Sequence, residues 1–163
     1  MIIKTKSLLL KKTDCDDPEL STLIEDIDTV SNLSESNIYP AETPRAISFR
    51  IEKNNQLIGE ACFKNIKLIN RKAELSIVIK REFRSKGYAG EALYAIIEYG
   101  FLNLNFHRLE AEVYKYNTTS IKLVESIGFI KEGELREAKY HDGKYHSILR
   151  YGLLKNEWQK DYK

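Results

Sequence analysis

The sequence predicts an α+β fold, with one domain over residues 1–163 and a mixed, mostly antiparallel sheet of six to seven strands. A length of 163 residues normally corresponds to a single domain with one core. In the centre, a strand, a long helix and a second strand predict a right-handed crossover between parallel strands. Hairpins on both sides of this unit add antiparallel strands. No internal repeat, low-complexity tract or linker divides the chain.

Composition and charge exclude several classes of protein. Apolar residues make up 42%, charged residues 31%, and the formal net charge is +2, which is ordinary for a soluble globular protein. No segment approaches the roughly 20 apolar residues that span a bilayer. A nearly balanced charge gives no electrostatic reason for nucleic-acid binding. Residues 1–6 lack the features of a signal peptide, so we expect a cytoplasmic protein with neither a membrane nor a nucleic acid as partner.

Cysteine and histidine positions give no metal site. Cys15 and Cys62 are expected to be free thiols, and neither has His or Cys neighbours at ligand spacing. The three histidines are scattered along the chain, at His107, His141 and His146. Since His141 lies in a predicted hairpin turn, we expect it to be exposed to solvent.

The N-terminal part reads as a strand, a helix and a loop. Apolar residues at Ile2, Ile3 and 8–10 suggest a first strand. Asp-Pro is a typical helix entry, so a helix is predicted over residues 18–28. Its apolar face would consist of Leu20, Leu23, Ile24 and Ile27. Residues 29–43 are polar with little periodicity and predict a mobile connecting loop, with a short helix as an option.

A hairpin precedes the central strand. Residues 47–51 alternate between apolar and polar, Asn54 and Asn55 supply a tight turn, and residues 57–63 return. Residues 66–71 then connect to an apolar, β-branched strand at 75–79.

The loop after this strand has the features of a phosphate site. Apolar positions beyond it switch to helical spacing and predict a helix of about 16 residues. The strand enters the helix through a loop that carries Gly87 and Gly90, where the first helical N–H groups are unpaired and are reinforced by the helix dipole. Because Gly87 lacks a Cβ, a phosphate can approach the backbone closely. Three cations add a positive field: Arg81, Arg84 and Lys86. The glycine spacing excludes both a P-loop and a dinucleotide fingerprint.

Residues 108–114 predict the next strand, which should lie parallel and adjacent to the strand at 75–79. A short helix follows, capped at its start by Asn117 or Thr118. Gly128 followed by the apolar Phe129 matches a left-handed C-terminal cap.

Two of these stretches resemble a known family. Arg84, Gly87 and Ala89 form an Arg-x-x-Gly-x-Ala pattern that resembles the pyrophosphate signature of the GCN5-related N-acetyltransferases (GNAT). The Asn-x-x-Ser and Gly-Phe pairs of residues 117–129 resemble the ribosomal-protein-alanine (RimJ/RimL-like) branch of that family. The similarity continues through three further segments, at 132–136, 140–145 and 151–158, and so covers roughly residues 44–158. Two motifs in the right order are far more specific than either alone.

The resemblance implies acetyl-CoA (coenzyme A) as the cofactor, held where the central parallel pair of strands splays apart. The pyrophosphate would be bound by the loop and the first helical turn, at Arg84, Ser85, Lys86, Gly87, Tyr88, Ala89 and Gly90. The backbone of Ile77 and Ile79 would pair with the pantetheine arm like an added strand, with the Ile77 N–H facing the carbonyl oxygen. Asn117 would bind the pantetheine or an ordered water, which is compatible with its role as a helix cap.

The sequence does not identify the group that would donate a proton to the leaving thiolate. Many relatives place a Tyr four residues before the Gly of the Gly-Phe pair, but here that residue is Val124, which cannot donate a proton. The role then passes to Ser120, to water or to no group, with Tyr114 and Tyr116 as alternatives.

The sequence also leaves several candidates for the general base that would deprotonate the amine. Glu74 precedes the central strand, and Glu110 and Glu112 lie on the neighbouring one. Strand alternation puts Glu110 and Glu112 on one face. A bulge in the central strand, usual in the family, would reverse the face of Glu74.

The implied activity is transfer of an acetyl group to a primary amine, on a peptide N-terminus or a small molecule, by direct attack in a ternary complex. The alternative is a non-catalytic acyl-CoA-binding regulatory module that has lost its proton donor. A homodimer is one possible assembly of the chain. The acceptor would be chosen by residues 29–43 and the last hairpin, which hold no dense acidic cluster; Ser147 stands where the family often has an acidic residue. A polyamine is therefore disfavoured.

Overall fold

The computed structural model describes residues 2–4, 9–11, 46–54 and 56–158. The chain falls into two compact units, residues 1–43 and 44–163. The single domain over residues 1–163 stays a prediction.

In the first unit, β1 (Ile2–Lys4) and β2 (Leu9–Lys11) pair antiparallel. The sequence predicts one strand here, and this prediction is wrong, because the polar residues 5–7 separate two apolar stretches that pair with each other. The predicted helix at 18–28, the loop at 29–43 and Cys15 lie outside the described residues.

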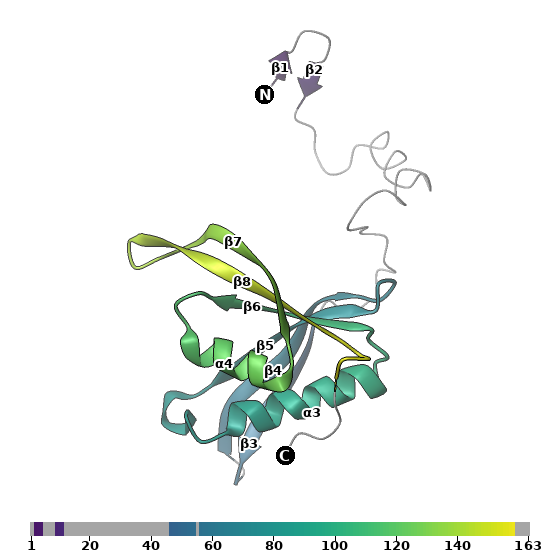
Figure 1. Ribbon diagram of the computed structural model, residues 1–163, viewed down its shortest axis with the longest axis vertical. Helices are drawn as coiled ribbons and strands as arrows, with labels where there is room; N and C mark the ends of the chain where they lie inside the picture. The colour runs from purple at the N-terminus through teal and green to yellow at the C-terminus, as the bar shows by residue number, and fades with distance from the viewer. Residues whose placement is uncertain (1, 5–8, 12–45, 55, 159–163) are drawn as a thin grey trace. The chain divides into compact units, whose positions relative to one another are not determined.

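The second unit contains a six-stranded sheet with the strand order β3-β4-β5-β6-β8-β7 (Figure 1). Its strands are β3 (Ile47–Lys53), β4 (Gln56–Lys67), β5 (Lys72–Ile79), β6 (Arg108–Tyr114), β7 (Ile130–His141) and β8 (Lys144–Leu154). Neighbouring strands run antiparallel, except for the parallel pair of β5 and β6. The predicted fold class is confirmed, with six strands in this sheet.

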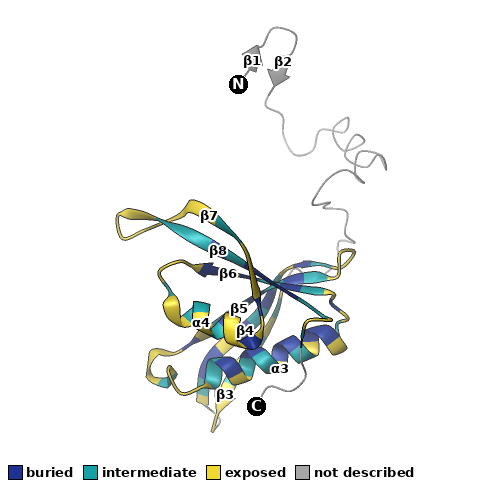
Figure 2. Cartoon of the chain, in the orientation of Figure 1, coloured by how far each residue is buried: buried dark blue, intermediate teal, exposed yellow. Residues whose placement is uncertain are grey.

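Two α-helices, α3 (Tyr88–Leu102) and α4 (Thr118–Ile127), share one hydrophobic core with the sheet. A short 3-10 helix, η1 (Arg81–Phe83), precedes α3. The core takes Leu93, Ile97 and Phe101 from α3, and Figure 2 shows buried residues along this helix while β7 is largely exposed. Each such buried side chain contributes roughly 1.5–3 kcal/mol, so α3 is a firm support for the loop at its start.

The helix at 118–127 is present as predicted: of the two candidate N-cap residues, Asn117 is the cap, and Gly128 (φ 108°) is the C-cap. By contrast, β4 extends to Lys67, into the predicted connection at 66–71. The register of β4 on β5 is irregular here, and Asn65 has a φ of 49°. This irregularity returns the side chain of Ile66 to the core, where it is buried, so the strand continues.

The parallel pair splays, as predicted. Pairing of β5 with β6 covers only Lys72–Arg108, Ala73–Leu109 and Glu74–Glu110. Beyond these residues β5 continues on β4, and β6 continues on β8. Backbone groups that face the gap between β5 and β6 therefore have no neighbouring strand to pair with.

Candidate active site

The loop between β5 and α3 forms a cradle at the N-terminus of the helix. Gly87 is the N-cap and has a φ of 83°, a conformation that glycine adopts without steric cost. A Cβ at Gly87 would meet no atom within 4 Å, so there is open space in front of the helix. The unpaired N–H groups of the first turn and the helix dipole favour an anion there, and a phosphate group fits.

Two cations hold this loop in place. Arg84 Nε donates to the carbonyl oxygen of Ile79 at 2.8 Å, and Lys86 Nζ donates to the carbonyl oxygen of Glu82 at 2.9 Å. An Arg guanidinium carries five N–H donors, so Arg84 can fix the loop and still donate to a phosphate.

A cavity of about 560 Å³ extends from the cradle along β5 to the start of α4. Its lining includes most of the predicted cofactor residues, namely Ile77, Ile79, Arg84, Ser85, Gly87, Tyr88, Ala89, Gly90 and Asn117. Lys86 is not part of the lining, since its ammonium group turns back to Glu82. This cavity is therefore the place that the structure offers to a long phosphate-bearing ligand.

The backbone of β5 supplies free groups along this cavity. The Lys80 N–H donates to the carbonyl oxygen of Ile58 in β4 at 2.8 Å. Successive residues of a strand turn their backbone groups to opposite edges, so those of Ile77 and Ile79 face the gap towards β6. The Ile79 carbonyl is taken by Arg84, whereas an extended ligand can pair with Ile77 as a strand would.

A second, smaller cavity of about 190 Å³ lies between β5, β6 and α4. It shares Ile77, Asn117, Ser120 and Leu123 with the larger cavity. Its other lining residues are Lys64, Glu74, Leu75, Ser76, Leu93, Ala111, Glu112, Val113, Tyr114, Val124 and Phe129. The two cavities thus meet where β5 and β6 diverge.

Asn117 and Ser120 lie at this junction. The Ser120 N–H donates to Asn117 Oδ1 at 3.1 Å, which is the helix cap that the sequence predicts. The cap fixes Ser120 in the first turn of α4, beside both cavities.

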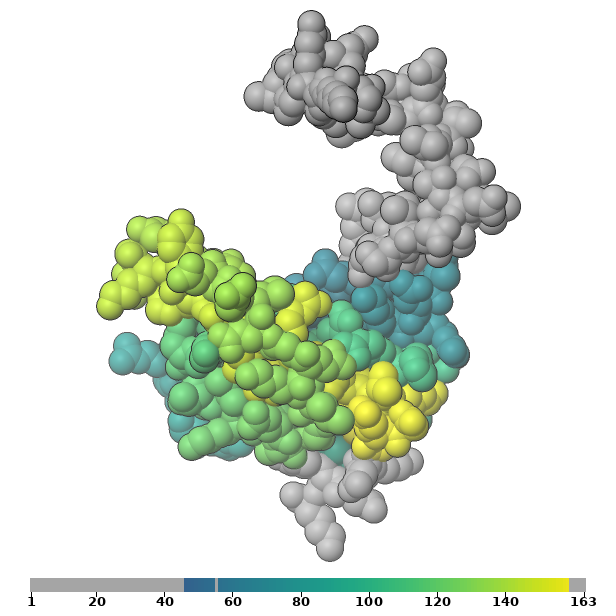
Figure 3. All heavy atoms as spheres, turned by 45° about the horizontal axis from the view of Figure 1, so that its top comes forward, coloured from purple at the N-terminus to yellow at the C-terminus, as the bar shows by residue number. Residues whose placement is uncertain are grey.

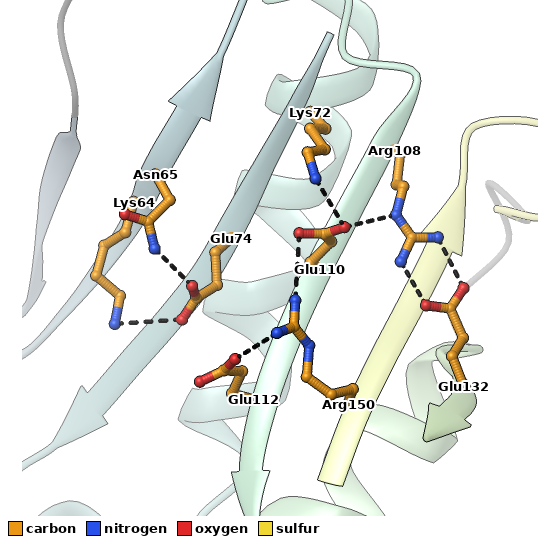
Figure 4. Close-up of polar contacts among 9 residues, drawn as sticks. All are labelled: Lys64, Asn65, Lys72, Glu74, Arg108, Glu110, Glu112, Glu132 and Arg150. Atoms are coloured by element: carbon orange, nitrogen blue, oxygen red, sulfur yellow. Dashed lines mark hydrogen bonds and ion pairs between the residues drawn. The ribbon is translucent and has the colours of Figure 1, made fainter. Parts of the chain in front are cut away.

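Glu74 lies on the same sheet face as Glu110, because the two residues pair in register between β5 and β6 (Figure 4). Its carboxylate accepts a hydrogen bond from Asn65 Nδ2 at 2.8 Å and lies 3.6 Å from Lys64 Nζ. Glu74 also lines the smaller cavity. It is therefore a carboxylate that a bound amine can reach.

Glu110 has a different environment. It forms ion pairs with Arg108 at 2.8 Å, Lys72 at 3.4 Å and Arg150 at 3.9 Å, and it lies outside both cavity linings. Arg150 also binds Glu112 at 3.0 Å, and Glu112 does line the smaller cavity. This placement favours Glu74 and Glu112 over Glu110 as groups that act on a ligand.

Arg108 extends the ion-pair network to β7. Its guanidinium binds both oxygens of Glu132, as well as Glu110 (Figure 4). The hydrogen bond to Glu132 is the main cause that raises the pKa of Arg108, and the same bond lowers the pKa of Glu132. Apart from Glu112, the residues of this network lie outside both cavity linings and stabilise the sheet beside the site.

Val124 lies in the wall of the smaller cavity and is buried, so this wall has no proton donor at the family's usual position. Two lining residues, Leu123 and Lys64, were not predicted from the sequence. Leu123 lies three residues after Ser120 on α4, a helical spacing that could have found it. Lys64 could not have been found, because its place depends on the register of β4 against β5.

Within the described residues, no group of three or more His, Cys, Asp or Glu side chains could hold a metal ion. In the same part of the chain, no helix is long and apolar enough to cross a membrane. Cys62 is a half-buried free cysteine, as expected.

A family profile described as an acetyltransferase (GNAT) domain matches residues 12–149. The chain belongs to the GNAT acetyltransferase family. Acetyltransferases of this family use acetyl-CoA, which agrees with the predicted cofactor.

Curated relatives include an uncharacterized N-acetyltransferase, p20 of Bacillus licheniformis, with 38% identity over 68% of this chain and 62% of the relative. The putative ribosomal N-acetyltransferase YdaF of Bacillus subtilis is 35% identical over 65% of this chain and 58% of its own length. The spermidine N(1)-acetyltransferase of Vibrio cholerae is 30% identical over 82% of this chain and 76% of its own length. This GNAT chain thus spans about three-fifths of the length of the first two relatives.

Solved structures agree with the fold. A crystal structure of a probable acetyltransferase has a TM-score of 0.67 and 33% identity, covering 70% of this chain and 64% of that one. The dodecameric spermidine N-acetyltransferase of Vibrio cholerae has a TM-score of 0.67 and 31% identity, covering 69% of this chain and 66% of that one. The GNAT sheet with its two helices is therefore the shared part.

Proposed function

We propose that this chain transfers the acetyl group of acetyl-CoA to a primary amine, by direct attack of the amine in a ternary complex. The observation that carries the proposal is the meeting of two cavities at Ile77, Asn117 and Ser120. The larger cavity, of about 560 Å³, would take the pantetheine and pyrophosphate of the donor, and the smaller one, of about 190 Å³, the amine end of an acceptor. Holding both reactants at one junction can supply a large part of the rate enhancement.

Each step of the transfer has a candidate residue. Acetyl-CoA supplies a thioester carbonyl that is already reactive towards amines. The backbone N–H of Ile77 would donate to the carbonyl oxygen as negative charge develops on it. Glu74 or Glu112, rather than Glu110, would accept the proton that the amine loses. As the C–N bond forms and the C–S bond breaks, Ser120 would donate a proton to the leaving thiolate.

For the acceptor we propose a peptide N-terminus, in keeping with the RimJ/RimL-like motifs and with the relative named as a putative ribosomal N-acetyltransferase. Spermidine is the second candidate, because other relatives are named as spermidine N-acetyltransferases. The charged side chains that the structure describes around the smaller cavity favour the peptide over spermidine. Glu74 and Glu112 already have Lys64 and Arg150 as partners, and these two cations repel a polyamine.

Thiol release from acetyl-CoA tests the proposal, with alaninamide, an alanine-terminated tetrapeptide and spermidine as acceptors. We expect release above the protein-free rate with the first two. Folded protein that binds acetyl-CoA in calorimetry but turns over no amine would support the regulatory module instead. Absence of acetyl-CoA binding at high micromolar concentration would contradict both readings.

A further inference from the structure

A row of aromatic rings begins at the wall of the smaller cavity and continues onto the hairpin of β7 and β8. Tyr114 lines that cavity. Tyr116 stacks on Tyr114 with ring centroids 5.4 Å apart, and on His141 with centroids 6.0 Å apart. His146 meets Tyr116 edge-on at 4.7 Å. We call these four residues the aromatic row.

The aromatic row is available to a ligand. None of its members belongs to the hydrophobic core of the described residues. Tyr114 is 36% exposed, Tyr116 is 46% exposed, and the side chain of His141 is 52% exposed. Figures 1 and 3 show the hairpin of β7 and β8 projecting from the rest of its unit. Contiguous exposed aromatic surface of this kind is typical of binding sites.

The row has the length of a short peptide. Its two stacking steps of 5.4 and 6.0 Å span at most about 11 Å, which an extended chain covers in three to four residues at about 3.3 Å each. A single amino acid held in the smaller cavity would not reach His141. The row is therefore suited to the residues that follow an N-terminal amine, not to the amine itself.

The charges along the row favour some side chains over others. Lys139 Nζ lies 5.9 Å from the centre of the Tyr114 ring and occupies the position that a ligand cation would seek. Lys144 lies opposite His141 in the register of the hairpin, and Asp142 contacts His141 at 3.4 Å. A polycationic ligand would meet Lys139 and Lys144, whereas apolar or aromatic side chains would stack on the rings.

We propose that the aromatic row binds residues two to four of a peptide acceptor whose N-terminal amine enters the smaller cavity, and that it selects apolar or aromatic side chains there. This rests on the proposed acetyl transfer to a peptide N-terminus and names the sequence class of that peptide. The row is continuous with the smaller cavity through Tyr114, so one extended chain can occupy both.

The test compares the binding of three fluorescent peptides to protein saturated with coenzyme A. Each begins with alanine, followed by two aromatic residues, two serines or two lysines. In the unmodified protein, we expect the aromatic peptide to bind about three- to tenfold more tightly than the serine peptide, and the lysine peptide to bind most weakly. Equal dissociation constants for the three peptides would overturn the proposal.

Three variants locate the effect. Tyr116→Ala and His141→Ala should each remove most of the preference for the aromatic peptide over the serine peptide. Tyr145→Ala is the matched control: Tyr145 is exposed on the same hairpin, and strand alternation places it on the face opposite His146. A preference that survives in the first two variants, or disappears equally in the control, would overturn the proposal. Thermal unfolding verifies that each variant is folded.

These experiments test peptide binding by the aromatic row and acetyl transfer independently, so that one can fail without the other. Turnover of alaninamide by the unmodified protein and by Tyr145→Ala reports on the proposed function. The three dissociation constants report on the aromatic row even if no acetyl group is transferred.

Discussion

At Gly87 the backbone has a φ of 83° and a Cβ would meet empty space, so the chemistry of a new side chain decides the outcome. Gly87→Glu should abolish acetyl-CoA binding in calorimetry, because a carboxylate would stand where a phosphate is expected and would repel it. Gly143→Glu is the matched control, since Gly143 also has a positive φ, of 74°, and open space around it. Both variants carry the same backbone strain, of about 1–2 kcal/mol. Unchanged affinity in Gly87→Glu would refute the position of the phosphate cradle.

Ser120→Ala should lower kcat by about a hundredfold and leave the acetyl-CoA dissociation constant almost unchanged. The reason is that proton donation matters only once charge develops on the leaving thiolate. Ser126→Ala in the same helix is the control, because its hydroxyl donates to the Leu123 carbonyl at 2.7 Å. If steady-state kinetics gave the same kcat for both variants and the unmodified protein, Ser120 would be only the start of α4.

Single residues were predictable from the sequence where the cause is local. Gly87, Asn117 and Gly128 are fixed by helix ends, and all three occupy the predicted positions. The choice between Glu110 and Glu112 was not predictable. It depends on Arg150, which reaches β6 only through the pairing of two strands far apart in the sequence.

Among the elements, α4 is attached to the sheet by a buried tyrosine. The Tyr151 hydroxyl donates to Glu125 Oε1 at 2.9 Å, and burial, with this bond, raises the pKa of Tyr151 from 10.0 to about 12. An unfolded tyrosine ionises from about pH 10, so the stability linked to Tyr151 is complete below that pH and is lost as the pH rises towards 12.

Tyr151→Phe tests this attachment. The variant should lose about 1 kcal/mol at neutral pH, because the Glu125 carboxylate loses its donor. Above about pH 10 its stability should fall less steeply than that of the unmodified protein, because Phe cannot ionise. Urea unfolding at a series of pH values measures both effects. Parallel pH curves for the two proteins would contradict the stated role of Tyr151.

The order of strands and helices could be predicted from the periodicity of apolar residues, but the ends of some elements could not. Alternation predicted the hairpin of β3 and β4, and capping residues predicted the start of α4 to within one residue and its end at Gly128. The extension of β4 to Lys67 was missed, since it depends on an irregularity at Asn65 that the alternation pattern hides. Long-range pairing, not local preference, decides such a boundary.

For the molecule as a whole, the charges are nearly balanced, with 26 Lys and Arg against 24 Asp and Glu. We therefore expect that spermidine is not the best acceptor in an amine screen at equal concentrations. Raising the salt from a low concentration to about 0.3 M should change the acceptor KM only modestly, because no strong field is there to be screened. Fastest turnover of spermidine, with a KM that rises steeply in salt, would show that folding gathers carboxylates which the sequence keeps apart.

The short parallel pairing of β5 and β6 has a consequence for hydrogen exchange. After Glu74 the amide of Ile77 has no strand beside it, so in the free protein it should exchange with solvent faster than the amides of Ser76 and Val78, which face β4. An acetyl-CoA arm lying in the gap would protect that amide as a seventh strand would. Donor present at a hundred times its dissociation constant would add about 2.7 kcal/mol to the free energy of unfolding. Bound acetyl-CoA would then supply the backbone partner that β5 lacks beyond Glu74.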